Sequence, residues 1–210
     1  MSSMRIEKRK LFFVFLLINC SGFSQNNLCD SIKYENANKY EQNGYKTGKW
    51  ITYDASTCRI IQIDTFLYGK KNGTTVSYMP NGQILSKFHF VNDTVDGLCF
   101  TYVIGGETCY FEYKQNKREG EVRVYDVAGI LIKKYNYVND ILQGNYYTYF
   151  KSGKINTKTT YLNGQENGSR LIYRDNKQND LLREFIFENG VRLKSIYYNR
   201  KGKVKKYISE

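Results

Sequence analysis

The sequence predicts an all-β protein built as an elongated array of antiparallel β-hairpins. Two observations predict this fold: a glycine recurs about every 24 residues, and a tyrosine follows each glycine by five residues. A fixed period of this length is typical of repeat proteins, in which each unit packs only on its neighbours. The glycines are Gly48, Gly73, Gly97, Gly120, Gly144 and Gly168, and the tyrosines are Tyr53, Tyr78, Tyr102, Tyr125, Tyr149 and Tyr173. We expect these tyrosines to pack on their neighbours in the next hairpin and to form the core of the repeats.

The composition also favours strands. Of the 210 residues, 20 are tyrosine and only one is proline, and 16% are aromatic. Disordered chains are poor in aromatic residues, whereas tyrosine, phenylalanine and β-branched residues pack well on a pleated surface. We find no helical periodicity of useful length after residue 24, so the array is expected to consist of strands and turns.

Residues 1–24 have the features of an export signal. A basic start precedes an apolar core, Leu11–Ile18, which is far shorter than the ~20 residues that a membrane-spanning helix needs. Gly22 and Ser24 occupy the −3 and −1 positions of a cleavage before Gln25. The protein is therefore expected to be exported by a signal peptide and to be periplasmic or secreted.

The cysteines leave two alternatives open. Cys20 follows Leu17-Ile18-Asn19, so a lipoprotein anchored at Cys20 is the alternative to cleavage after residue 24. If residues 1–24 are removed together with Cys20, four cysteines remain, and an even number in an exported chain permits two disulfides. Cys99 and Cys109 are the pair close in sequence and form the candidate disulfide; alternatively, each is a small buried thiol. The four cysteines are Cys29, Cys58, Cys99 and Cys109.

Residues 25–45 are polar and lack alternation, so they are expected to form a lead-in or cap before the array at 46–210. In the first arm of each repeat, the third and fifth residues after the glycine share one face of a strand. In five of six copies both are large apolar or aromatic residues. The fourth copy has Arg123 there, with Val122 and Val124 opposite, which predicts either burial on both faces or a shift in register.

Each first arm ends in a turn signal, such as Pro80-Asn81-Gly82, in which glycine suits a backbone position of positive φ. A return strand and a second turn follow. Turn signals spaced roughly 8–12 residues apart between strand-like runs predict an all-β meander. The second turns are expected at Asn92-Asp93, Asn139-Asp140, Asn163-Gly164 and Asn189-Gly190.

The repeat unit reads Gly-x-Trp/Tyr-x-x-Tyr, a turn glycine, and a return strand ending Tyr-x-Asn-Gly. It resembles MORN repeats in their longer bacterial variant, with six clear copies and a degenerate seventh over about residues 45–207. The resemblance implies a ribbon of successive hairpins that forms one long twisted sheet. Some bacterial members are similar to the YwqK-type antitoxin family, which implies an antitoxin-like role.

Positive charge gathers near the C-terminal end. The formal net charge is +12, and the first 24 residues carry +3 of it. Residues 191–209 contain seven basic residues and no acid. These residues are expected either to protect the sheet edge from further pairing or to bind an anionic envelope surface; nucleic acid is a weaker alternative for an exported chain. They are Arg192, Lys194, Arg200, Lys201, Lys203, Lys205 and Lys206.

Catalytic and metal-binding motifs were sought in the sequence without a match. The single histidine, His89, lies between Phe88 and Phe90 in a strand-like run, which is no setting for a catalytic triad. There is no His-Glu-x-x-His, Cys-x-x-Cys or Gly-x-Ser-x-Gly, and carboxylates are not clustered at calcium-ligand spacing. We therefore expect no cofactor, no metal and no enzymatic activity.

The functional expectation that follows is a non-catalytic exported scaffold that binds another protein. An elongated sheet with an incompletely covered tyrosine face would make a suitable binding surface, because tyrosine offers a large amphipathic contact area at low entropic cost. Two alternatives are an antitoxin or immunity-type binder of a specific toxin, on the family resemblance, and an envelope-polymer hydrolase.

Overall fold

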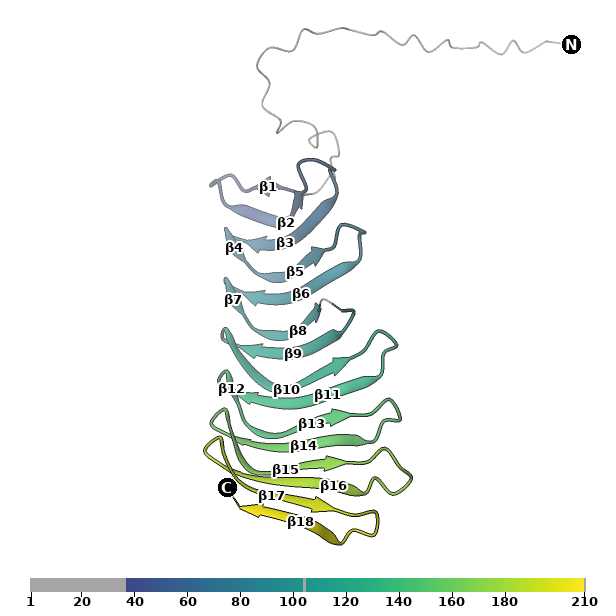
Figure 1. The fold of residues 1–210 in the computed structure, drawn as a ribbon. Helices are drawn as coiled ribbons and strands as arrows, with labels where there is room; N and C mark the ends of the chain where they lie inside the picture. The colour runs from purple at the N-terminus through teal and green to yellow at the C-terminus, as the bar shows by residue number, and fades with distance from the viewer. Residues whose placement is uncertain (1–36, 104, 210) are drawn as a thin grey trace, which may run out of the picture.

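The computed structural model describes residues 37–103 and 105–209. In these residues the chain forms 18 strands of one antiparallel sheet, and no helix long and apolar enough to cross a membrane is present among them. Consecutive hairpins follow one another along the array from the N-terminal to the C-terminal end (Figure 1). The predicted fold class is thus confirmed. The predictions for residues 1–24, Cys20 and Cys29 lie outside the described residues.

Seven hairpins make up the array, and each strand pairs with the next one along the chain. Fourteen long strands form the hairpins, and four strands of two residues flank them. The long strands are β2 (Lys46–Tyr53), β3 (Ile60–Leu67), β5 (Gly73–Tyr78), β6 (Ile84–Val91), β8 (Gly97–Tyr102), β9 (Thr108–Lys114), β10 (Lys117–Tyr125), β11 (Leu131–Val138), β13 (Gly144–Tyr149), β14 (Ile155–Leu162), β15 (Gln165–Tyr173), β16 (Leu181–Glu188), β17 (Val191–Tyr198) and β18 (Val204–Ser209). The short strands are β1 (Lys39–Tyr40), β4 (Lys70–Lys71), β7 (Thr94–Val95) and β12 (Ile141–Leu142).

The two kinds of turn lie on opposite margins of the sheet (Figure 1). At the predicted second turns both central residues have positive φ, as at Asn139 (50°) and Asp140 (68°). This is the type I′ geometry, whose twist matches that of the flanking strands. Tyr68-Gly69 and Gln115-Asn116 adopt the same geometry, although their residue types alone did not predict a turn there.

The most buried side chains lie on one face of the sheet, which we call the packed face. It carries the second and fourth residues after each repeat glycine, together with their cross-strand partners. Aromatic rings continue along it; for example, Tyr135 and Tyr146 stack with their centroids 4.8 Å apart. Eight of the nine buried apolar or polar residues belong to this face: Asp64, Thr75, Cys99, Val122, Val124, Thr159, Phe185 and Ser195.

The six repeat tyrosines, which we expected to form the core, are half-buried on the opposite face, here called the open face. The strand register shifts at the tyrosine in most copies, as between Ser77 and Tyr78 and between Thr148 and Tyr149. Such a bulge bends the strand and increases its local twist. The tyrosines lie at the end of each first strand, beside this shift in register.

The N-terminal margin of the sheet is covered by residues from the predicted cap. β1 pairs with β2, and Ala37 bridges Lys49. The side chain of Asn38 accepts a hydrogen bond from the backbone N–H of Ile51 (2.7 Å) and donates one to its carbonyl oxygen (3.3 Å). Ile51 is consequently the one buried apolar residue on the open face of the described sheet.

Candidate functional site: an aromatic groove on the open face

The third and fourth repeats depart from the pattern of the others on the open face. One residue after the repeat glycine, five copies have a polar residue, whereas the third has Leu98, which is 68% exposed. Three residues after the glycine, the fourth copy has Arg123 where the other five are apolar or aromatic. Since equivalent positions of a repeat have the same structural role, departures confined to one copy point to a functional role.

Arg123 belongs to a small charge cluster. Its guanidinium lies 2.6 Å from Oε1 of Glu121, and Nζ of Lys134 lies 2.9 Å from Oε2 of the same carboxylate. The hydrogen bond from Lys134, assisted by Arg123, lowers the pKa of Glu121 in spite of some burial. One carboxylate is thus shared by two cations, and the cluster keeps a net positive charge.

The turns of these two repeats meet next to the cluster. Val127 stands at the tip of its turn and is 76% exposed. The other copies have Ala55, Pro80, Ile104, Lys151, Asp175 and Arg200 at this position. A Cβ added to Gly106 would lie 2.2 Å from Cγ1 of Val127. The isopropyl group can therefore lie over the neighbouring turn only because residue 106 has no side chain.

Together these residues line a groove of about 560 Å³, which we call the tyrosine groove. A second hollow, of about 290 Å³, shares Leu98 and Tyr110 with it and extends it toward Lys87. Volumes of this size suit a small ligand or a few side chains of a partner. The tyrosine groove is lined by Leu98, Tyr102, Gly106, Thr108, Tyr110, Arg123, Tyr125, Asp126, Val127 and Gly129.

The aromatic floor of the groove is held by ring contacts. The ring of Tyr110 lies 5.3 Å from that of Phe100 and 5.8 Å from that of Tyr125, the second contact being edge-on. Such contacts favour defined ring orientations. Asp126 is already engaged, because its carboxylate accepts the backbone N–H groups of Ala128 and Ile130, each at 2.9 Å. The groove thus offers a preformed apolar surface with one cationic side.

Two of the six repeat tyrosines, Tyr102 and Tyr125, line the groove. The other four, Tyr53, Tyr78, Tyr149 and Tyr173, lie outside it in their own repeats. Leu98, Tyr110 and Val127 were not singled out from the sequence. The position of Leu98 in the repeat would have revealed it, since the other copies are polar there, whereas the contribution of Tyr110 depends on strand pairing.

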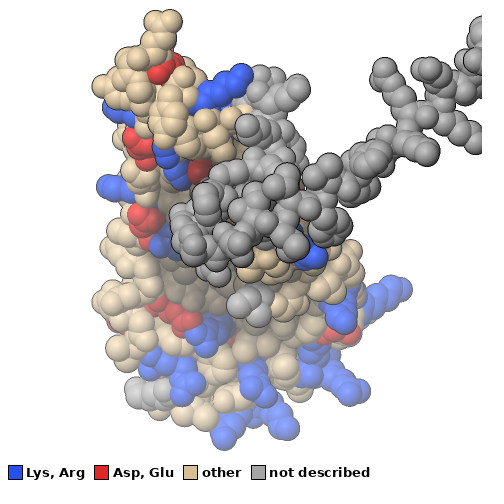
Figure 2. Space-filling model, turned by 90° about the horizontal axis from the view of Figure 1, so that it is seen from above, with Lys and Arg blue, Asp and Glu red and all other residues tan. Residues whose placement is uncertain are grey.

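The seven basic residues near the C-terminal end are all exposed and lie on β17, β18 and the turn between them. They are eight or more strands removed from β8 in the order of pairing, so they take no part in the groove. Arg192 stacks on Phe185, with the guanidinium 5.5 Å from the ring centroid. In a view down the array from above, Lys and Arg side chains project at the lower edge of the picture with few acids beside them (Figure 2).

Cys99 and Cys109 keep free thiols, so the predicted disulfide between them is not formed. Cys99 is opposite Phe111, and Cys109 is opposite Thr101. The two cysteines are therefore diagonal neighbours, whose separation of roughly 7–8 Å exceeds the usual Cα distance of a disulfide. Burial raises the pKa of both thiols. Cys58, by contrast, is disulfide-bonded.

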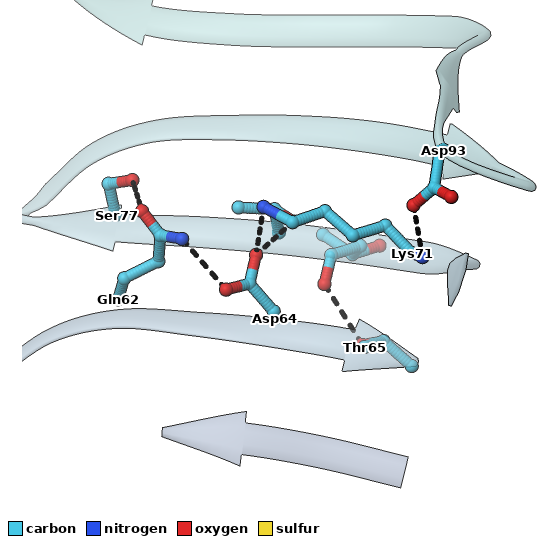
Figure 3. A network of polar contacts seen from close by, with 8 residues as sticks. Gln62, Asp64, Thr65, Lys71, Ser77 and Asp93 are labelled. Carbon is cyan, nitrogen blue, oxygen red and sulfur yellow. Dashed lines mark hydrogen bonds and ion pairs between the residues drawn. The ribbon is translucent and has the colours of Figure 1, made fainter. Parts of the chain in front are cut away.

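A polar network interrupts the packed face near the N-terminal end (Figure 3). The carboxylate of Asp64, which is 7% exposed, accepts hydrogen bonds from Lys71 (2.8 Å), Thr75 (2.7 Å) and Gln62 (2.8 Å). Burial by itself would raise the pKa of Asp64, but these donors outweigh it and lower the pKa. Because every partner stabilises the ionised carboxylate, we interpret the network as structural support. No grouping of three or more candidate metal ligands occurs among the described residues.

The fold and the repeating hairpins define this molecule as a β-hairpin repeat protein with a single open sheet. The family model of the MORN repeat variant matches residues 71–92 and 142–163, each of which spans one repeat from the end of one second turn to the next. These two matches confirm the MORN-type repeats that the sequence resemblance indicated. A search of curated proteins found no match to the chain.

Proposed function

We propose that this protein is an exported, non-catalytic scaffold that binds another protein through the tyrosine groove. The observation that carries the proposal is the paired departure of two neighbouring repeats from the pattern of the others. Leu98 exposes apolar surface where the other five copies have a polar residue, and Arg123 places a cation where they have an apolar or aromatic one. Both residues line the groove, together with the exposed Val127. The export signal read in residues 1–24 supports a location outside the cytoplasm.

The binding part of the proposal is tested by restoring the repeat pattern. Leu98→Thr and Val127→Lys introduce the residues that stand at the same positions in other copies, Thr74 and Lys151, so the double variant should fold normally. The matched control is Val191→Lys, which adds a charge at an exposed valine of the last hairpin. Immobilised proteins would be incubated with envelope and culture-medium extracts, and bound proteins quantified by mass spectrometry.

We expect the wild type and the control to retain the same proteins and the double variant to lose them. Equal recovery by all three proteins, with circular dichroism showing intact folds, would contradict a role for the groove in binding. Export is tested separately by sequencing the N-terminus of the protein from producing cells. A start at Gln25 supports cleavage after Ser24, and a lipid-modified Cys20 supports the anchored form.

An antitoxin or immunity-type function would be a special case of the same binding, and the family resemblance is what favours it. Co-expression with the product of the neighbouring gene tests it. Relief of toxicity by the wild type, but not by the Leu98→Thr/Val127→Lys variant, would identify the toxin as the groove's partner. Unchanged toxicity with the wild type rejects that product as the partner.

A further inference from the structure

We infer that the segment bound on the open face is an extended acidic peptide that runs along the array, across the strands, and places an apolar side chain in the tyrosine groove. This inference rests on the proposed function and adds the chemistry and direction of the partner. The inference is based on a row of side chains that are far apart in the sequence and become neighbours through strand pairing.

The row, here called the central row, crosses seven consecutive long strands from β6 to β14. Each member is the cross-strand partner of the next. Six strand spacings of ~4.8 Å give it a length of roughly 29 Å. It consists of Lys87, Phe100, Tyr110, Arg123, Lys134, Tyr147 and Lys158.

Cations and aromatic rings are interleaved along this row. Lys87 precedes Phe100 and Tyr110, and Lys158 follows Tyr147, with its ammonium 6.0 Å from the ring centroid. Within the described residues, neither Lys87 nor Lys158 forms an ion pair. The row is thus a linear succession of rings and cations, in which Arg123 and Lys134 share Glu121 and the two outermost lysines are unpaired in the described part of the chain. Such a row is complementary to a chain that alternates carboxylates with apolar groups.

The groove determines where the apolar side chain of the partner would lie. Both hollows adjoin the central row: Tyr110 lines both of them, Arg123 lines the larger, and Lys87 and Phe100 line the smaller. An occupant of the groove therefore has a carboxylate-binding group on each side, with Arg123 toward one end and Lys87 toward the other. Glu121 already engages Arg123 and Lys134, so an incoming carboxylate competes with Glu121 at that end.

The test uses a random dodecapeptide library displayed on phage and selected on the purified protein. We expect recovered peptides to contain Asp or Glu close to a large apolar residue. Their affinities would then be measured for Lys87→Gln/Lys158→Gln and for Lys194→Gln/Lys206→Gln. The second variant removes the same charge from the C-terminal basic residues and is the matched control.

Removal of the two row lysines should weaken peptide binding about tenfold. Each exposed ion pair contributes up to roughly 1 kcal/mol, and the loss of two such pairs is comparable to the roughly 1.4 kcal/mol that corresponds to a tenfold change in Kd. The control should change it less than about twofold, as expected for charges farther away than the screening length. Glu121→Gln should strengthen binding, since it removes the competing carboxylate. This opposite sign separates a local role of the row from a loss of fold.

Equal weakening by the two lysine variants, or selected peptides without acids, would overturn the inference. Preferential binding of a 20-nucleotide single-stranded oligothymidylate with the same dependence on Lys87 and Lys158 would assign the row to nucleic acid instead. The proposed function fails in a different way: selected peptides would then bind the Leu98→Thr/Val127→Lys variant as well as the wild type.

Discussion

Asp93 and Lys71 hydrogen-bond to each other in both directions between consecutive hairpins. The backbone N–H of Asp93 donates to the carbonyl of Lys71 (2.8 Å), and the carboxylate of Asp93 accepts the backbone N–H of Lys71 (2.7 Å). The turn that contains Asp93 is thereby joined to the short strand β4, which contains Lys71 and follows the preceding second turn. The same exchange recurs between Asn116 and Val95 and between Asp140 and Arg118.

This exchange predicts graded effects of substitutions at Asn116, where φ is 65°. Asn116→Gly keeps the backbone conformation and loses only the side-chain hydrogen bond to Val95, so it should cost about 1 kcal/mol. Asn116→Ala should cost about 1–2 kcal/mol more, because alanine is strained in the left-handed region. Urea unfolding measures both; equal losses would show that strain at this turn is negligible.

The buried carboxylate of Asp64 predicts an acid-dependent stability difference. Its folded-state pKa is lowered relative to an unfolded value of about 3.9. Its stabilising contribution is therefore complete above about pH 5 and is lost as the pH falls through the folded-state pKa. The difference in Tm between wild type and Asp64→Asn should be largest near neutral pH and should shrink toward pH 2.

Thr75→Val provides a second measurement of the same network, because it removes one hydrogen bond to Asp64 and leaves the carboxylate in place. Its Tm difference from wild type should follow the same pH trend with a smaller amplitude. Differences that stay constant from pH 7 to pH 2 for both variants would show that ionised Asp64 does not stabilise the fold.

Gly106 and Gly129 form a matched pair for testing the contact beneath Val127. Both have positive φ (89° and 77°), but a Cβ at Gly129 would meet nothing within 4 Å. Gly106→Ala should therefore lower the free energy of unfolding by about 1 kcal/mol more than Gly129→Ala, because the added methyl group forces Val127 from its preferred rotamer. Adding Val127→Ala should remove that excess in a double-mutant cycle; an unchanged excess would exclude the contact as its cause.

The two free thiols should react slowly and unequally with iodoacetamide. Burial raises the pKa of both, which lowers the thiolate fraction at pH 8. Cys99 is 1% exposed and Cys109 is half-buried, so Cys109 should be labelled first in the folded protein and both should react readily in urea. Peptide mapping resolves the two sites, and faster labelling of Cys99 would contradict the strand register.

Most of the repeat could be predicted from the sequence because each unit repeats a local rule. Turns such as Asn139-Asp140 combine a residue preference with a fixed place in the period, and both of these features indicated a turn. Gln115-Asn116 lacked the first signal and was missed. The groove was missed for a different reason: Tyr110 and Arg123 become neighbours only through pairing of β9 with β10, and no local pattern reports that contact.

The sequence by itself determined the hairpin period, the all-β class and the position of most turns, since these depend on residues close together in the chain. Only the tertiary structure decided which face is packed. The alternation of side chains places Val122 and Tyr125 on opposite faces of a strand, but it does not determine which face is buried by packing. That choice depends on the bulges and curvature of the assembled sheet, which bury Val122 and leave Tyr125 beside an open groove.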